Sequence, residues 1–300
     1  MSDFAFEVIR SWGDFNDSVR KMASSEPEVR WLYRGQPSDD PLRTTIERAL
    51  DSWGIDLAYA TSIEFQTIRE FRRRLRQPEY DRVHRDTLHC LALMRHHFAP
   101  TRLLDCTYSP FVAAAFAMEN GIFLAGTDPR RPVVWCFNVK WCEEAAERKL
   151  PLYQRTLIGR RNDDAQRNDK TFIPLFQIKS SRVVTAEPRW KFVKSENPLH
   201  LNERLTAQQG AFLCPADLSS SFEVNLKEMD GWYSKAKVLK LYLELSQDEA
   251  NRFARNLKDM NISFAALFPG LDGFAKSINQ QIVHYYELGR AGLGIASPIS

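Results

Sequence analysis

Apolar and polar residues follow two spacings along this chain, and each spacing predicts one type of secondary structure. Apolar side chains at helical spacing predict helices at residues 57–75, 86–97, 111–118, 247–259 and 271–281. Short runs rich in β-branched and aromatic residues predict strands at residues 29–35, 102–107, 132–139, 172–178, 181–187, 210–215, 221–226 and 238–245. Because strands and helices are intermixed without regular βαβ spacing, we expect an α+β fold, with a curved or split mixed sheet and flanking helices.

Three segments call for their own predictions. Residues 3–22 are interrupted by Gly13, which predicts a short helix, a break and a second helical turn, so that residues 1–28 form a helical cap. Residues 121–126 are expected to pair with the strand at 132–139 as a hairpin. Residues 148–170 are polar and basic, which indicates a mobile solvated loop or, alternatively, a segment that contacts phosphates.

The composition is that of an ordinary folded protein. Of the 300 residues, 44% are hydrophobic and 26% are charged, which excludes a disordered, collagen-like or coiled-coil chain. The 41 basic and 38 acidic side chains leave a net charge of +3, so nucleic-acid binding cannot be inferred from bulk charge and any basic surface must be local. The N-terminus does not resemble a secretory signal and no long apolar run occurs, so no membrane partner is expected.

The cysteines and the missing motifs narrow the chemistry. The five cysteines are scattered without a CxxC pair, which predicts buried thiols, no metal site and a reducing, cytoplasmic location. The sequence contains no GxGxxG, GxxxxGK[ST], HExxH or GxSxG motif. A Rossmann dehydrogenase, a P-loop NTPase, a zincin and an α/β-hydrolase are therefore disfavoured.

Four segments dispersed along the chain form a recognisable set. They are LYRGQ at residues 32–36, RHHFAPTRLLDCTYSP at 95–110, RLTAQQGAF at 204–212 and LFPGLDG at 267–273. These segments resemble the signature blocks of FRG-domain proteins. Their order is the order of the family's blocks, and together they cover roughly residues 30 to 275. The resemblance implies one large domain at residues 29–290, followed by a tail at 291–300.

A second resemblance supplies chemistry. An aromatic-Arg-Gly sequence at a strand end, followed by a strand with Ser and Thr that leads into an Ala-rich helix, is similar to the Arg-Ser-Glu class of ADP-ribosyltransferases. The similarity implies an ADP-ribosyltransferase-like core with NAD as substrate. By matching position, Arg34 would contact the NAD phosphate and ribose, Thr107 and Ser109 would shape the nicotinamide pocket, and a residue near Gln208 would bond the ribose hydroxyl.

Physical chemistry leaves two roles open for each residue of the first strand and its partners. The planar guanidinium of Arg34 suits phosphate oxygens and Gly35 permits close approach of a ligand, with Gln36 as a further cofactor contact. Alternatively, Arg34 pairs with Asp105 or Glu64 to join strand to helix. Asp105 belongs to a buried structural network with Arg102, or it orients a ligand hydroxyl or Arg34.

The remaining candidates also have two readings. Thr107 and Tyr108 line a pocket or fill a sheet face, and Ser109 binds ligand or caps the helix that begins at Pro110. His96 contacts a ligand or transfers a proton; alternatively, it lies at a helix end only because the helix dipole favours a cationic ring there. Gln208 contacts a ribose hydroxyl or ties a strand to a neighbouring loop.

An amide carries no charge to stabilise an oxocarbenium-like transition state, so Gln208 alone does not complete the site. The acid would then come from Glu203, Glu223 or Asp105. We expect an NAD-dependent ADP-ribosyltransferase-like enzyme that acts on a protein or nucleic-acid acceptor, as a toxin or defence effector with room for a regulatory partner. The alternative is a non-catalytic module that recognises a nucleotide or nucleic acid.

Overall fold

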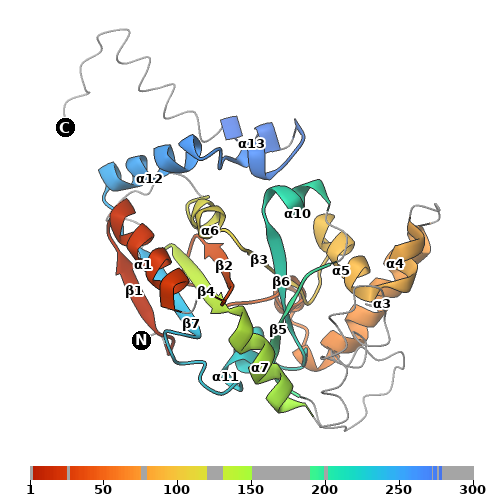
Figure 1. Cartoon of the computed structure of the whole chain (residues 1–300). Helices are drawn as coiled ribbons and strands as arrows, with labels where there is room; N and C mark the ends of the chain where they lie inside the picture. Colours follow the sequence, from red (N-terminus) through yellow and green to blue (C-terminus); the bar gives the residue numbers. More distant parts are fainter. Residues whose placement is uncertain are drawn as a thin grey trace.

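The computed structural model describes residues 3–25, 28–75, 80–119, 131–150, 190–198, 202–271, 273–275 and 277–278. In this part of the chain one mixed sheet of seven strands runs in the order β1-β7-β4-β2-β3-β6-β5 (Figure 1). The strands are β1 (Phe6–Ile9), β2 (Trp31–Gln36), β3 (Leu104–Thr107), β4 (Val133–Asn138), β5 (Val193–Glu196), β6 (Gly210–Pro215) and β7 (Val238–Leu243). β1 and β7 are parallel and every other neighbouring pair is antiparallel. The fold is α+β with flanking helices, as the sequence predicts.

Helices cover both faces of this sheet (Figure 1). One face packs against α1 (Trp12–Ser25), α6 (Pro110–Ala117), α12 (Gln247–Asp259) and α13 (Phe264–Leu267). The other packs against α3 (Ala60–Arg74), α4 (Asp81–Arg85), α5 (Thr87–His96), α7 (Val139–Lys149) and α11 (Phe222–Lys227). The remaining elements are α2 (Thr45–Ser52), the 3-10 helix η1 (Leu57–Tyr59) and α10 (Glu203–Ala207).

Alternation along the central strands explains the two layers. On β2, Leu32 joins the core on the α5 side and Tyr33 joins the core on the α6 side. On β4, Trp135 and Cys136 divide between the same two cores. Successive side chains of a strand point to opposite faces, so a strand covered on both faces is mostly apolar; all six residues of β4 are buried, and the first five are apolar.

Helix α6 packs so closely against β2 at Gly35 that no side chain would fit between them. A Cβ added at Gly35 would lie 1.8 Å from the carbonyl oxygen of Ala113 and 2.5 Å from the amide nitrogen of Ala117. The glycine therefore admits the backbone of α6, with its small buried alanines, to the surface of the sheet. Ser109 caps this helix, since its Oγ accepts a hydrogen bond from the Val112 amide.

A buried ion pair joins α3 to the beginning of β3. Arg102 and Glu64 are both 0% exposed, and Arg102 Nε lies 3.0 and 2.9 Å from the two carboxylate oxygens. The Nη1 atom of Arg102 also donates to the carbonyl oxygens of Pro215 and Ala216 at the end of β6. The prediction of a buried structural network at Arg102 is confirmed, with Glu64 rather than Asp105 as its partner.

Two predicted elements are wrong. Residues 6–9, expected in a helix, form strand β1, and α1 continues through Gly13 instead of breaking there. Residues 221–226, expected as a strand, form most of α11, whose N-cap is Ser221. The hairpin segment at 121–126, the strands at 172–178 and 181–187, most of the loop at 148–170 and the end of the helix at 271–281 lie outside the described residues. Within the described residues, no helix has the length and apolar character needed to cross a bilayer.

Candidate functional site

The sheet opens between β2 and β3, and a cavity lies at this opening. The two strands pair only at Tyr33 and Thr107, and no further ladder pair joins them. Residues of both strands line a cavity of about 570 Å³, a volume within the range of about 300–1,000 Å³ that is usual for small-molecule sites. Parts of all four segments that resemble signature blocks reach this cavity, through residues such as Arg34, Asp105, Gln208 and Phe268.

The charged residues that line the cavity are mostly arginines. Five arginines face the cavity against three carboxylates; they are Arg34, Arg43, Arg48, Arg95 and Arg204, with Asp40, Asp105 and Glu119. Within the described residues, the ion pairs formed by these arginines join Arg95 to Asp105 and Arg43 to Asp51, which lies outside the cavity lining. The positive charge of the cavity is thus only partly neutralised by the protein.

Arg34 lies where β2 and β3 separate. Its Nη1 donates to the backbone carbonyl of Asp105 at 2.8 Å, and its Nε donates to Gln36 Oε1 at 3.1 Å. Both acceptors are neutral, so they orient the guanidinium without cancelling its charge. Burial lowers the pKa of Arg34, while the nearby charge of Asp105 acts in the opposite direction. The predicted pairing of Arg34 with Asp105 is therefore a bond to the main chain, and Glu64 is bound to Arg102 instead.

The carboxylate of Asp105 is held by Arg95. Arg95 Nε and Nη2 lie 2.8 and 2.7 Å from Asp105 Oδ2, and the Asp105 side chain is 38% exposed. Charge-assisted pairs of this kind fix both side chains in one orientation. Asp105 thus presents a fixed carboxylate to the cavity, and Arg95, at the end of α5, is its partner.

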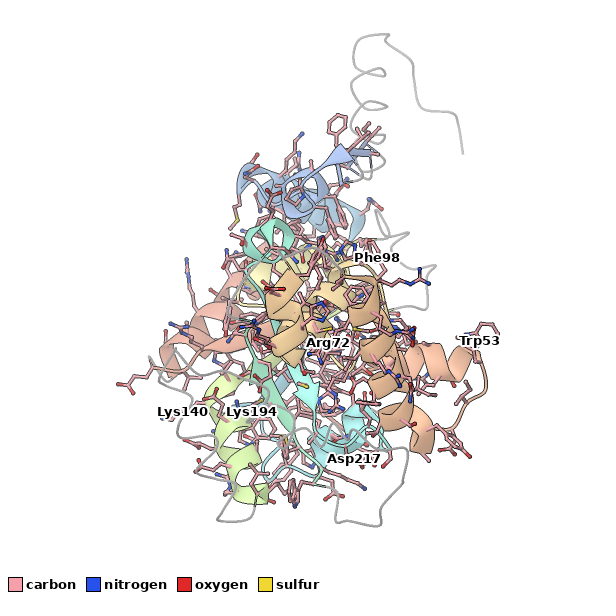
Figure 2. All side chains as sticks on the ribbon, turned by 90° about the vertical axis from the view of Figure 1, so that its right-hand side faces the viewer. Trp53, Arg72, Phe98, Lys140, Lys194 and Asp217 are labelled. Atoms are coloured by element: carbon pink, nitrogen blue, oxygen red, sulfur yellow. The ribbon has the colours of Figure 1, made fainter. Side chains whose placement is uncertain are left out.

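One edge of the cavity combines a cation with aromatic rings. The guanidinium carbon of Arg204 lies 4.5 Å from the ring centroid of Phe268 and 5.6 Å from that of Phe98. Phe98 is 75% exposed, with a backbone φ of 62°, and Figure 2 shows it at the surface beside the helices that face the viewer. A left-handed conformation is costly for a residue with a Cβ, and such residues are concentrated at functional sites. Phe116 also lines the cavity.

The wall formed by the loop after β2 is held in place from outside. Asp39 accepts bonds of 2.7 Å from Lys240 Nζ and from the hydroxyl of Tyr242. Gln36 Nε2 donates to the carbonyl of Asp40 at 3.0 Å. Lys240 in turn lies 4.3 Å above the ring of Trp135. These contacts fix the loop, so this side of the cavity is formed before any ligand arrives.

The other predicted residues of the second and third blocks hold the backbone around the cavity. Thr107 lines it, but its Oγ1 donates to the carbonyl of Gln208 at 2.7 Å. Gln208 also lines it, and its Nε2 donates to the carbonyl of Leu267 at 2.9 Å. The structure places Gln208 at the C-cap of α10, two residues before β6, and its amide ties this segment to α13.

Ser109, Tyr108 and His96 are not among the lining residues. The Ser109 hydroxyl is occupied as the α6 cap, and the Tyr108 hydroxyl bonds the side chain of Asn197. His96 packs edge-on against His97, and burial, with the charges of His97 and Arg204, lowers its pKa. These effects favour the neutral form of the His96 ring.

Gly35 and Cys106 line the cavity without offering chemistry to a ligand. The position that a Cβ of Gly35 would take is filled by α6, so the absence of a side chain is needed for the approach of this helix. Burial raises the pKa of the Cys106 thiol to about 12, which leaves it protonated and unreactive. All five cysteines are buried and free, as predicted. Within the described residues, no group of three or more His, Cys, Asp or Glu side chains could hold a metal ion.

Sequence reasoning missed several lining residues. Arg48 lies on α2, a helix that was not predicted, although Thr44 and Glu47 form a capping box at its start that could have revealed it. Arg204 is the first residue of the block at 204–212 but was not singled out, and Glu119, just after α6, has no signal in its local sequence. Of the acids considered beside Asp105, neither Glu203 nor Glu223 lines the cavity.

Comparison with known proteins finds a match to one family model. Neither the curated proteins nor the solved structures include a match to this chain. Residues 29–122, which supply β2, β3 and most of the arginines of the cavity, match the family model of the FRG domain.

Proposed function

We propose that this protein binds a nucleotide in the cavity between β2 and β3. The observation that carries the proposal is the presence, in one cavity of about 570 Å³, of five arginines and three phenylalanines. Guanidinium groups match phosphate oxygens in charge and in the geometry of their donors. Aromatic rings offer flat apolar surfaces on which a base can stack. A nucleotide combines the two chemical features that these side chains recognise.

The proposal assigns the two ends of the ligand to different walls. The phosphate lies near Arg34 and Arg48, which form no ion pair with a carboxylate of the described residues. The base lies against Phe98 and Phe268, beside the guanidinium of Arg204. ADP and NAD, which both combine phosphates with an aromatic base, are the ligands to test.

Titration calorimetry of the full chain with ADP and with NAD tests this proposal. Arg34→Gln should weaken binding at least tenfold, because a charge-assisted bond to phosphate is lost. Arg73→Gln is the matched control, since Arg73 is an exposed arginine on α3 that pairs with Glu70 and lies outside the lining. Absence of binding by the unmodified protein would refute the proposal, as would equal loss in the two variants.

A second candidate function is ADP-ribosyl transfer from NAD. It is favoured by two carboxylates, Asp105 and Glu119, that share the cavity with the arginines. In this reaction the bond between ribose C1′ and the nicotinamide nitrogen breaks, and its electron pair leaves with nicotinamide. A nucleophile of the acceptor then bonds C1′ and loses its proton, and a carboxylate stabilises the cationic ribose between these events. Here Asp105 or Glu119 takes the role that the family resemblance assigned near Gln208.

Release of nicotinamide from NAD, with and without candidate acceptors, tests the transfer reaction. Glu119→Gln and Asp105→Asn remove one carboxylate each, and at least one of them should lower the rate of release by tenfold or more while NAD still binds. If the protein binds NAD and releases no nicotinamide under any condition, transfer is refuted. The chain would then be a recognition module for nucleotides.

A further inference from the structure

The arginines of the cavity differ in how completely the protein neutralises them. Arg95 has the carboxylate of Asp105, and Arg43 has that of Asp51. Arg34 and Arg48 have no carboxylate within ion-pair distance among the described residues. Arg34 is partly buried and Arg48 is exposed at the cavity, so both guanidiniums are open to an anionic ligand.

The donors of Arg34 are already arranged for an external acceptor. Nη1 and Nε are engaged by the Asp105 carbonyl and by Gln36 Oε1. These two bonds fix the plane of the guanidinium and leave Nη2 without a protein acceptor in the described part of the chain. A planar group held from two sides in this way loses little conformational freedom when a ligand binds.

Arg48 lines the same cavity from α2. Burial, followed by the charges of Arg34 and Arg95, lowers the pKa of Arg48, which places these cations within electrostatic range of one another. The helix that carries Arg48 is anchored by Glu47, whose carboxylate accepts hydrogen bonds from Thr44 and from the Phe222 amide. Arg48 Nη1 donates to the carbonyl of Arg43, again a neutral acceptor.

We propose that Arg34 and Arg48 form a subsite for a terminal phosphate monoester. A monoester carries a charge of about −1.5 to −2 at neutral pH, whereas a phosphate diester carries one negative charge and has fewer free oxygens. Two guanidiniums without carboxylate partners match the doubly charged group. The cavity accordingly prefers a nucleotide that ends in a phosphate monoester over one whose phosphates are all internal. This inference rests on the proposed nucleotide binding and narrows the ligand class.

The experiment compares the binding of AMP and 3′,5′-cyclic AMP by titration calorimetry. The two ligands share a base and a ribose, but the phosphate of AMP is a monoester and that of cyclic AMP is a diester. At pH 7.5 AMP should bind about tenfold more tightly, the effect of one additional charge near two guanidiniums. The second ionisation of a phosphate monoester has a pKa near 6, so at pH 5.5 AMP affinity should fall toward that of cyclic AMP. NADP against NAD provides a second pair that differs only in a monoester.

Two variants and one control locate the preference. Arg48→Gln, on an exposed helix position, and Arg34→Gln should each reduce the ratio of AMP to cyclic AMP affinity toward one. Arg73→Gln should leave the ratio unchanged. A ratio of one in the unmodified protein, with both ligands bound, would overturn the monoester subsite and leave nucleotide binding intact.

Two smaller probes separate the two proposals. Inorganic phosphate and ribose 5-phosphate carry the charge without the base. If either binds as tightly as AMP and loses affinity in Arg48→Gln, the subsite stands and the nucleotide assignment fails. If none of the phosphates binds, both proposals fail.

Discussion

The pair between Arg102 and Glu64 allows the clearest test of how this fold is held together. Both side chains are 0% exposed, and the carboxylate of Glu64 also accepts a bond from the Arg102 amide. Glu64→Gln would keep the size of the side chain but remove its charge, so the guanidinium would remain buried without neutralisation. Removing one partner of a buried pair costs about 3–5 kcal/mol, a large part of a typical unfolding free energy of about 5–15 kcal/mol.

Urea unfolding followed by tryptophan fluorescence measures this loss, with the slope against urea as a check that the variant unfolds in the same manner. Glu70→Gln provides the control, because its pair with Arg73 is 60% and 66% exposed and should be worth about 0.2–1 kcal/mol. A combined Glu64→Leu and Arg102→Met variant should recover only part of the loss, since the carbonyl oxygens of Pro215 and Ala216 lose their donor. A cost below about 1 kcal/mol for Glu64→Gln would refute the view that this charge pair anchors α3 to β3.

Three other predictions concern residues around the cavity. Gly35→Ala should lower the free energy of unfolding, measured in urea, by about 1–3 kcal/mol or more, because the new Cβ would lie 1.8 Å from the Ala113 oxygen. Gly13→Ala is the control and should not lower it, since the nearest atom to its Cβ lies at 3.5 Å. Equal effects of the two substitutions would contradict the packing role of Gly35. His96 has a lowered folded-state pKa, so the unfolded chain binds the proton more readily and stability should fall as pH drops below about 6.5. His96→Gln should reduce this fall, and an unchanged stability–pH profile would disprove the assignment. The thiol of Cys106, with a pKa of about 12, should resist alkylation at pH 8 until the protein is unfolded; rapid labelling of the native chain at Cys106, located by peptide mass analysis, would show that this thiol is accessible.

Local sequence determined the helices and strands wherever spacing and end signals agreed. The helix at 247–259 and the cap at Ser109 are examples, because each has a hydroxyl immediately before its first turn. Strand β1 could not be predicted in this way, since it is set by parallel pairing with β7, more than two hundred residues away. Residues 221–226 alternate like a strand, but the Ser221 cap and the burial of Phe222 and Leu226 stabilise a helix instead.

The residues of the cavity could also be predicted from the sequence only in part. The four segments could be recognised in the sequence, and the structure brings residues from each of them to one opening in the sheet. Their individual roles depend on distances that no local pattern encodes. Ser109 and Gln208 are occupied by backbone partners, whereas Arg48, which no motif marks, and Arg204, which was not singled out within its block, line the cavity with Arg34.

A crystal structure of the protein with bound AMP would test the central claim most directly. The account predicts the nucleotide between β2 and β3, with a phosphate oxygen about 3 Å from Arg34 Nη2 and the base against Phe98 or Phe268. A nucleotide bound elsewhere on the protein, with this cavity empty, would contradict it.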